Sequence, residues 1–196
     1  MTRRLILSGL WLLAGLTPAF AHIGEGVSGG LAAGFAHPLF GPDHLLAMVS
    51  VGIWGAQLGT PAIWMLPIGF PLIMAVGGAL GVAGIPLPAT ELLIALSVLT
   101  LGLLIARAER LPVAAAFVIV AIFAVAHGHA HGVELPKSAD ALAFSVGFVV
   151  ATGMLHATGI LIGLLIKWPA GAMTIRCLGS LVALAGVYFI FNSLEA

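Results

Sequence analysis

Charged side chains are scarce in this chain. Seven Lys/Arg and seven Asp/Glu residues make up 7% of the 196 residues, and their formal charges cancel to zero. A soluble domain carries roughly 25% charged residues, and a nucleic-acid-binding protein needs a basic stripe or patch. The composition therefore argues against a soluble domain, and no nucleic-acid partner is expected.

Cysteine and two common functional motifs are also rare or missing. Cys177 is the only cysteine, so the chain cannot form an internal disulfide. The sequence contains neither a GxxxxGK[ST] motif, which would cradle nucleotide phosphates, nor an HExxH motif, which would mark a zinc protease. ATP hydrolysis would need a partner protein, and no prosthetic group is expected.

Apolar residues dominate instead, at 61% of the chain. Prolines, glycines and rare charges divide it into six apolar stretches of membrane-spanning length. These stretches cover residues 27–58, 61–84, 88–106, 111–128, 139–166 and 172–192. The sequence therefore predicts an all-α polytopic membrane protein with six transmembrane helices.

The first apolar stretch is longer than one span requires, and Pro38, Gly41 and Pro42 interrupt it. These residues predict a broken first helix. Irregular backbone at membrane depth is tolerated only where protein or a cavity surrounds it, because lipid cannot satisfy free N–H and C=O groups. The break is therefore expected to face the interior of the helix bundle.

Residues 1–21 have the features of a signal peptide. Arg3 and Arg4 form a basic start, an apolar segment follows, and residues 19–21 form an A-x-A cleavage site. Cleavage would make His22 the mature N-terminus and leave residues 22–196 as one transmembrane transport domain. The alternative is an uncleaved first helix, but its apolar core is short for a span.

The basic residues predict an orientation in the membrane. With a translocated N-terminus, Arg107, Arg110, Lys167 and Arg176 fall on the cytoplasmic side, and Lys137 falls outside. This distribution follows the positive-inside rule. We therefore expect a bacterial inner-membrane protein whose mature N-terminus and C-terminus are both periplasmic.

The sequence HPLFGPDH, residues 37–44, places His37, Asp43 and His44 in an apolar surrounding. An ionisable group at membrane depth costs at least ~2.5 kcal/mol unless it is paired, so such groups mark functional sites. Imidazole suits Ni²⁺, Co²⁺ and Zn²⁺, and a carboxylate neutralises their charge. The alternative is structural: Asp43 would cap a helix, and His44 would hydrogen-bond within the core. Together the three residues favour a metal site.

A second motif, HGHAHGVE, covers residues 127–134. His127, His131 and Glu134 stand at i, i+4 and i+7, which is one face of a helix, while His129 points the other way. That face offers two imidazoles and a carboxylate to a cation. The two glycines weaken a helix, so a histidine-rich loop is the alternative.

Four further residues are candidates with less specific signals. His156 lies near the middle of an apolar stretch, where a structural role and a metal-ligand role are equally reasonable. His22, if signal cleavage exposes it, could chelate a cation through its α-amine and its imidazole. Glu91 and Asp140 stand at the ends of predicted spans, where they could attract cations or cap helices, and they are not assigned as ligands.

Together, HPLFGPDH and HGHAHGVE resemble the motifs of the HupE/UreJ family of nickel/cobalt permeases. The first motif matches as His37, five intervening residues, Asp43 and His44, and the resemblance extends over nearly the whole chain. One departure is Ala126, where the family often carries an aromatic residue, but this change removes no ligand. The resemblance implies secondary uptake of Ni²⁺ or Co²⁺ to supply metalloenzymes such as hydrogenase or urease.

The expected function is therefore a permease in the lipid bilayer whose substrate is a divalent transition-metal ion. In this hypothesis the ion meets His22 and the second motif first, and then reaches a site built by the first motif. Two alternatives remain. One is an intramembrane zinc-dependent hydrolase with Glu134 or Asp43 as general base, and the other is a metal-binding component that does not itself transport.

Overall fold

The computed structural model describes residues 26–135 and 140–195. The predicted signal peptide, His22 and Lys137 lie outside the described residues. Within the described ranges, every regular element is helical. The elements are α2 (Gly26–Phe40), α3 (Pro42–Leu58), α4 (Ala62–Val82), α5 (Thr90–Arg107), α6 (Val113–Val133), α7 (Ala141–Gly163), the short 3₁₀ helix η2 (Leu164–Lys167) and α8 (Pro169–Glu195).

Five of these helical segments are long and apolar enough to cross a membrane. They are α4, α5, α6, α7 continued through η2, and α8. The prediction of an all-helical, multi-pass membrane protein is confirmed. The sequence predicts six spans, and the difference lies in the first apolar stretch. It forms two helices of 15 and 17 residues, each shorter than the roughly 20 residues of a span.

The two helices of this first stretch meet at Gly41. Gly41 is extended, with φ −86° and ψ 105°, and α3 begins directly afterwards at Pro42. Proline suits the first position of a helix because its missing N–H would have no partner there. The Gly41 carbonyl accepts a hydrogen bond of 2.8 Å from the Leu45 N–H, which closes the first turn of α3.

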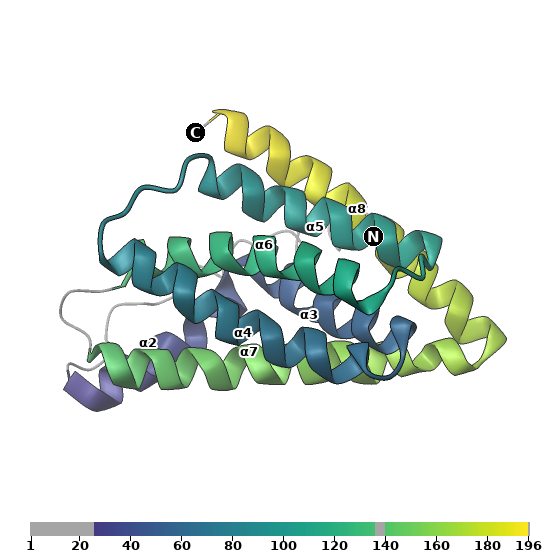
Figure 1. Ribbon diagram of the computed structural model, residues 1–196, viewed down its shortest axis with the longest axis horizontal. Helices are drawn as coiled ribbons and strands as arrows, with labels where there is room; N and C mark the ends of the chain where they lie inside the picture. The colour runs from purple at the N-terminus through teal and green to yellow at the C-terminus, as the bar shows by residue number, and fades with distance from the viewer. Residues whose placement is uncertain (1–25, 136–139, 196) are drawn as a thin grey trace, which may run out of the picture.

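The helices pack in pairs (Figure 1). α4 lies against α6, α5 against α8, and α7 against both α2 and α3. Glycine allows the close approach: a Cβ added at Gly77 or Gly81 of α4 would overlap the carbonyls of Val125 or His129 in α6. Lipid is as apolar as leucine, so membrane helices associate through such tight packing rather than through the hydrophobic effect.

The two ends of the bundle carry opposite charges. The α3–α4, α5–α6 and α7–α8 connections lie at one end, and the α4–α5 and α6–α7 connections at the other (Figure 1). The four described basic residues lie at or near the first end: Arg107, Arg110, Lys167 and Arg176. Arg176 is fixed there because its Nε donates a hydrogen bond of 2.9 Å to the Ala106 carbonyl. One carboxylate, Glu109, shares this end, so its net charge is positive. Four carboxylates lie toward the other end: Glu91, Glu134, Asp140 and Glu195.

Candidate metal centre

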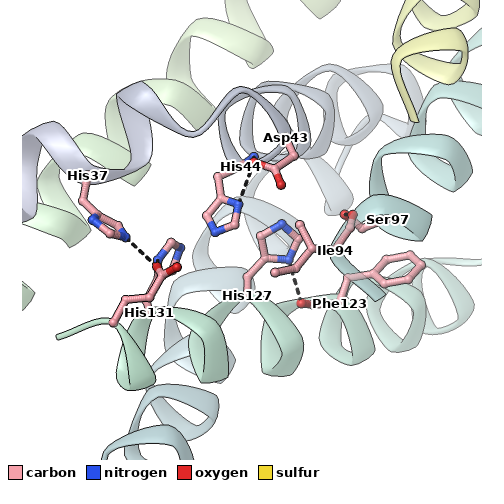
Figure 2. A network of polar contacts seen from close by, with 9 residues as sticks. His37, Asp43, His44, Ile94, Ser97, Phe123, His127 and His131 are labelled. Atoms are coloured by element: carbon pink, nitrogen blue, oxygen red, sulfur yellow. Dashed lines mark hydrogen bonds and ion pairs between the residues drawn. The ribbon is translucent and has the colours of Figure 1, made fainter. Parts of the chain in front are cut away.

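The two histidine motifs meet between α2, α3 and α6. Figure 2 shows His37 and His44 reaching from α2 and α3 toward His131 and His127, which point back from α6. The ring centroid of His131 is 4.8 Å from that of His37 and 4.3 Å from that of His44. The ring centroid of His127 is 5.0 Å from that of His44. The four imidazoles therefore form one continuous cluster.

The second motif is helical, so the loop alternative is wrong. α6 continues to Val133 and carries His127 and His131 on the face that points into the cluster. The glycines of this motif explain why the helix persists. A Cβ at Gly128 or Gly132 would overlap the carbonyls of Met74 or Gly78 in α4. Close packing against α4 therefore outweighs the low helix propensity of glycine.

Glu134 brings a carboxylate to the outer side of the cluster, directly after the last residue of α6. Its Oε2 lies 3.1 Å from Nε2 of His37, within hydrogen-bond distance, and 3.7 Å from Nδ1 of His131. The adjacent imidazoles of His131 and His37 hold the pKa of the Glu134 carboxyl well below its ordinary value. One ligand-type atom from each of these three residues lies within 4.8 Å of the other two, which is close enough to share one cation.

Asp43 supplies a second carboxylate on the inner side. Its Oδ1 accepts a hydrogen bond of 2.9 Å from the His44 backbone N–H and lies 3.2 Å from Nδ1 of His44. Asp43 is not the N-cap of α3, because that position is Gly41 and no side chain caps the helix. The helix-cap alternative is therefore wrong for Asp43. It is correct for Asp140, whose Oδ1 accepts a hydrogen bond of 2.7 Å from the Ala143 N–H at the start of α7.

Each of the two α6 histidines in the cluster has a ring nitrogen that is available to a ligand. His127 is fully buried; its Nδ1 is 2.9 Å from the Phe123 carbonyl, and its Nε2 has no hydrogen-bond partner among the described residues. A bond from Nδ1–H to a carbonyl is the arrangement that directs the Nε2 lone pair of a histidine at a metal. His131 is 6% exposed, and neither of its ring nitrogens has a partner at hydrogen-bond distance in the described part of the chain.

His129, the middle histidine of the second motif, faces away from the cluster as predicted. Its Nε2 donates a hydrogen bond of 2.8 Å to the Ile85 carbonyl in the α4–α5 connection. Its Nδ1 lies 3.4 Å from Oγ1 of Thr90. His129 therefore ties that connection to α6.

His156 lies on α7, away from the four clustered imidazoles. Its Nδ1 is 3.0 Å from the Pro67 carbonyl in α4. Within a helix this carbonyl would accept from residue 71, but Pro71 has no N–H. His156 therefore satisfies a carbonyl that proline leaves free, which accounts for its buried Nδ1. Phe70 lies between this histidine and the cluster, with its ring centroid 5.5 Å from those of both His127 and His156.

Glu91 interacts electrostatically with residues of the cluster, although the sequence did not predict this. It stands in the first turn of α5, and its charge interacts with those of Asp43, His44 and Glu134. The only sequence signal was a carboxylate at the end of a span, which fits a helix terminus equally well. Glu91 therefore adds negative charge to the surroundings of the two carboxylates in the cluster, which favours a cation.

The donor set is selective for transition metals. Imidazole nitrogens suit Ni²⁺, Co²⁺ and Zn²⁺, while Mg²⁺ and Ca²⁺ prefer all-oxygen sites. The ligand-type atoms come from three separate helices.

Comparisons with known proteins agree with the two motifs. The family described as HupE / UreJ protein matches residues 10–189. Protein HupE from Rhizobium leguminosarum bv. viciae is 46% identical over 168 residues, which cover 86% of this chain and 87% of that protein. No solved structure matches the chain.

Proposed function

Because the chain belongs to the HupE/UreJ family, we propose that it is a secondary transporter that takes up Ni²⁺ or Co²⁺ across the bacterial inner membrane. HupE/UreJ is a family of membrane transporters and accessory proteins, not of enzymes, which excludes the hydrolase alternative.

The main support for this proposal is the cluster of four imidazoles and two carboxylates inside a multi-pass helix bundle. Leaving such groups in an apolar surrounding costs free energy unless a partner offsets it. A dehydrated divalent cation is that partner, because the imidazoles replace its water and the carboxylates neutralise its charge. The contact between His44 and His131, at a centroid distance of 4.3 Å, joins both motifs in one site.

The exposure of the side chains gives the cluster a direction. The side chains of His37 and Glu134 are 30% and 52% exposed, whereas His127 is completely buried. We infer that the cation binds first at His37, Glu134 and His131, and then at His44, Asp43 and His127. His131 takes part in both steps because it contacts both His37 and His44. His22 and His156 stay predictions: His22 as the first contact, and His156 as a ligand.

The membrane topology is part of the proposal. In the proposed topology, α2 and α3 together cross the membrane once as a broken helix. With α4, α5, α6, α7 and α8 this makes six crossings after signal cleavage at Ala21. The four basic residues at one end of the bundle support a cytoplasmic position for that end. The acidic end, with both mature termini, is then periplasmic.

A transporter must also release its ion, so the site has to change shape. His37 lies before Gly41 and His44 after it, on separate helices. A small rotation at Gly41 would change the distance between these two ligands. The sequence has no P-loop motif for ATP. Passive or ion-coupled movement of the cation is therefore the simpler account of transport.

Reconstitution of the purified chain tests the proposal. Liposomes hold a metal-sensitive dye, and Ni²⁺ or Co²⁺ is added outside, with and without a pH gradient. We expect the dye to respond with the wild-type chain and not with His37→Ala, Asp43→Ala or His44→Ala. His129→Gln is the matched control, because its amide can still donate to the Ile85 carbonyl.

Two results would contradict this assignment. Wild-type transport by all three alanine variants would exclude the cluster as the transport site. Tight binding of Ni²⁺ by the purified wild-type chain without a dye response would instead favour the metal-binding component that does not transport.

A further inference from the structure

Hydroxyl groups on the described helices differ in whether they are hydrogen-bonded. Ser145, Thr158, Thr174 and Ser180 are exposed, and each donates a hydrogen bond of 2.8 to 3.0 Å to the carbonyl four residues earlier. Ser50 in α3 and Thr152 in α7 are fully buried, and their hydroxyls have no hydrogen-bond partner among residues 26–135 and 140–195. A buried hydroxyl without a partner is unusual and indicates a position for water or an ion.

Ser50 belongs to a polar stripe along α3. Asp43, Ser50 and Gln57 are spaced by seven residues, so they share one face of the helix and follow one another at about 10 Å along its axis. The Gln57 side chain is also incompletely bonded. Its Nε2 donates a hydrogen bond of 3.1 Å to the Ile105 carbonyl, while its buried Oε1 has no partner within the described part of the chain. The stripe begins at the metal centre and ends near the basic end of the bundle.

This stripe faces α5 at both of its ends. Gln57 bonds the Ile105 carbonyl near the end of α5, and the Asp43 charge interacts with that of Glu91 in the first turn of α5. Between these ends, Ser97 of α5 is buried, and its hydroxyl donates a hydrogen bond of 2.6 Å to the Ile94 carbonyl. The lone pairs of the Ser97 oxygen remain free to accept a hydrogen bond. Figure 2 shows Ser97 on the α5 side of the metal centre. Oxygen atoms therefore line the seam between α3 and α5.

We propose that the cation leaves the histidine cluster along the Asp43–Ser50–Gln57 face of α3, between α3 and α5, toward the basic end. This inference rests on the proposed transport function and adds the route of release. Neutral hydroxyl and amide oxygens are weaker ligands for Ni²⁺ and Co²⁺ than imidazole. They hold water around the ion without trapping it, and conduction requires binding that is weak enough for the ion to leave.

Cysteine substitution tests the route directly. Cys177 is the only cysteine, so Cys177→Ser gives a background in which each added thiol reacts alone. In liposomes, a small cationic methanethiosulfonate reagent should modify Ser50→Cys and Gln57→Cys and stop Ni²⁺ uptake. Val51→Cys is the matched control: Val51 is the next residue and is fully buried in the apolar core, so its thiol should not react.

Two labelling results would overturn the route. One is a Ser50→Cys thiol that reacts no faster than the Val51→Cys thiol. The other is a reactive Thr152→Cys thiol with an unreactive Ser50→Cys thiol, because the ion would then pass along α7.

A blocking variant separates this route from the transport function itself. Ser50→Leu should lose Ni²⁺ uptake while the purified protein still binds Ni²⁺, and Ser50→Ala, which leaves room for water, should transport. Wild-type uptake by Ser50→Leu would overturn the route and leave the transport function standing. A wild-type chain that takes up no Ni²⁺ would overturn the transport function. If Ser50→Leu also loses Ni²⁺ binding, the loss of uptake no longer tests the route. The reactivity of the Ser50→Cys thiol relative to the Val51→Cys thiol then decides whether the route is correct.

Discussion

His131 and His129 stand two residues apart on α6 and are equally buried, at 6% and 7% exposure. His129 bonds the Ile85 carbonyl and approaches Thr90. His131 has no hydrogen-bond partner among the described residues, yet two imidazoles and a carboxylate surround it. Burial therefore does not separate a structural histidine from a proposed metal ligand. The two histidines differ in their neighbours: both ring nitrogens of His129 have partners in the α4–α5 connection and α5, whereas His131 keeps its ring nitrogens unbonded within the described ranges, among other ionisable groups.

One substitution on each face of α6 tests most directly whether the two faces differ in function. His131→Gln should abolish Ni²⁺ binding and uptake, because His131 is the imidazole that contacts both His37 and His44. His129→Gln should keep both activities. Isothermal titration of the purified proteins and dye-filled liposomes measure the two effects. Equal losses in the two variants would show that the faces of α6 do not differ in function.

Acidification should weaken binding at the cluster strongly. An imidazole must be neutral to bind a metal, so each one that has to lose a proton lowers affinity by about tenfold per pH unit below its pKa. The pKa of Glu134 is held well below its ordinary range by His131 and His37, so this carboxylate stays charged. Affinity for Ni²⁺ should therefore be highest where the ligating imidazoles are neutral and fall once the pH drops below their pKa values. Titration of the wild-type protein from about pH 8 to about pH 3.5 measures this effect, and a flat profile over the whole range would argue against imidazole ligands.

Glu134 and Asp140 allow the same comparison for carboxylates. Glu134→Gln keeps an acceptor near His37 but removes the charge of a proposed ligand. Ni²⁺ affinity should therefore fall by at least about 10- to 100-fold, since loss of a group that only supports a ligand already has that effect. Asp140→Asn is the control, because Asp140 caps α7. It should change thermal stability slightly and leave affinity unchanged. A larger loss of affinity in Asp140→Asn than in Glu134→Gln would reverse the assignment.

The sequence predicted the helical membrane fold, the clustered residues of both motifs and the outward direction of His129, because these follow from composition and from helical spacing. It did not decide between helix and loop for residues 127–134, since the carbonyls of α4 that accommodate Gly128 and Gly132 are distant in the chain. The place of Glu91 beside Asp43 likewise depends on how α5 packs against α3. Such contacts between helices are not encoded in local patterns.

Substitution of His156 should have the smallest effect of these changes, and this effect should be on stability. The missing N–H of Pro71 is visible in the sequence, but only the packing of α7 against α4 brings His156 to the free Pro67 carbonyl. His156→Leu should leave that carbonyl unpaired and destabilise the protein by about 1–3 kcal/mol. Pro71→Ala restores an N–H at the position that bonds the Pro67 carbonyl in a regular helix.

The two substitutions form a double-mutant cycle, measured as unfolding free energies in detergent. If His156 acts through the Pro67 carbonyl, His156→Leu should cost less in the Pro71→Ala background than in wild-type protein. An equal cost in both backgrounds would mean that His156 does not act through that carbonyl. Loss of Ni²⁺ uptake in His156→Leu without loss of stability would move His156 to the ligands, because its buried Nε2, like that of His127, has no hydrogen-bond partner in the described part of the chain.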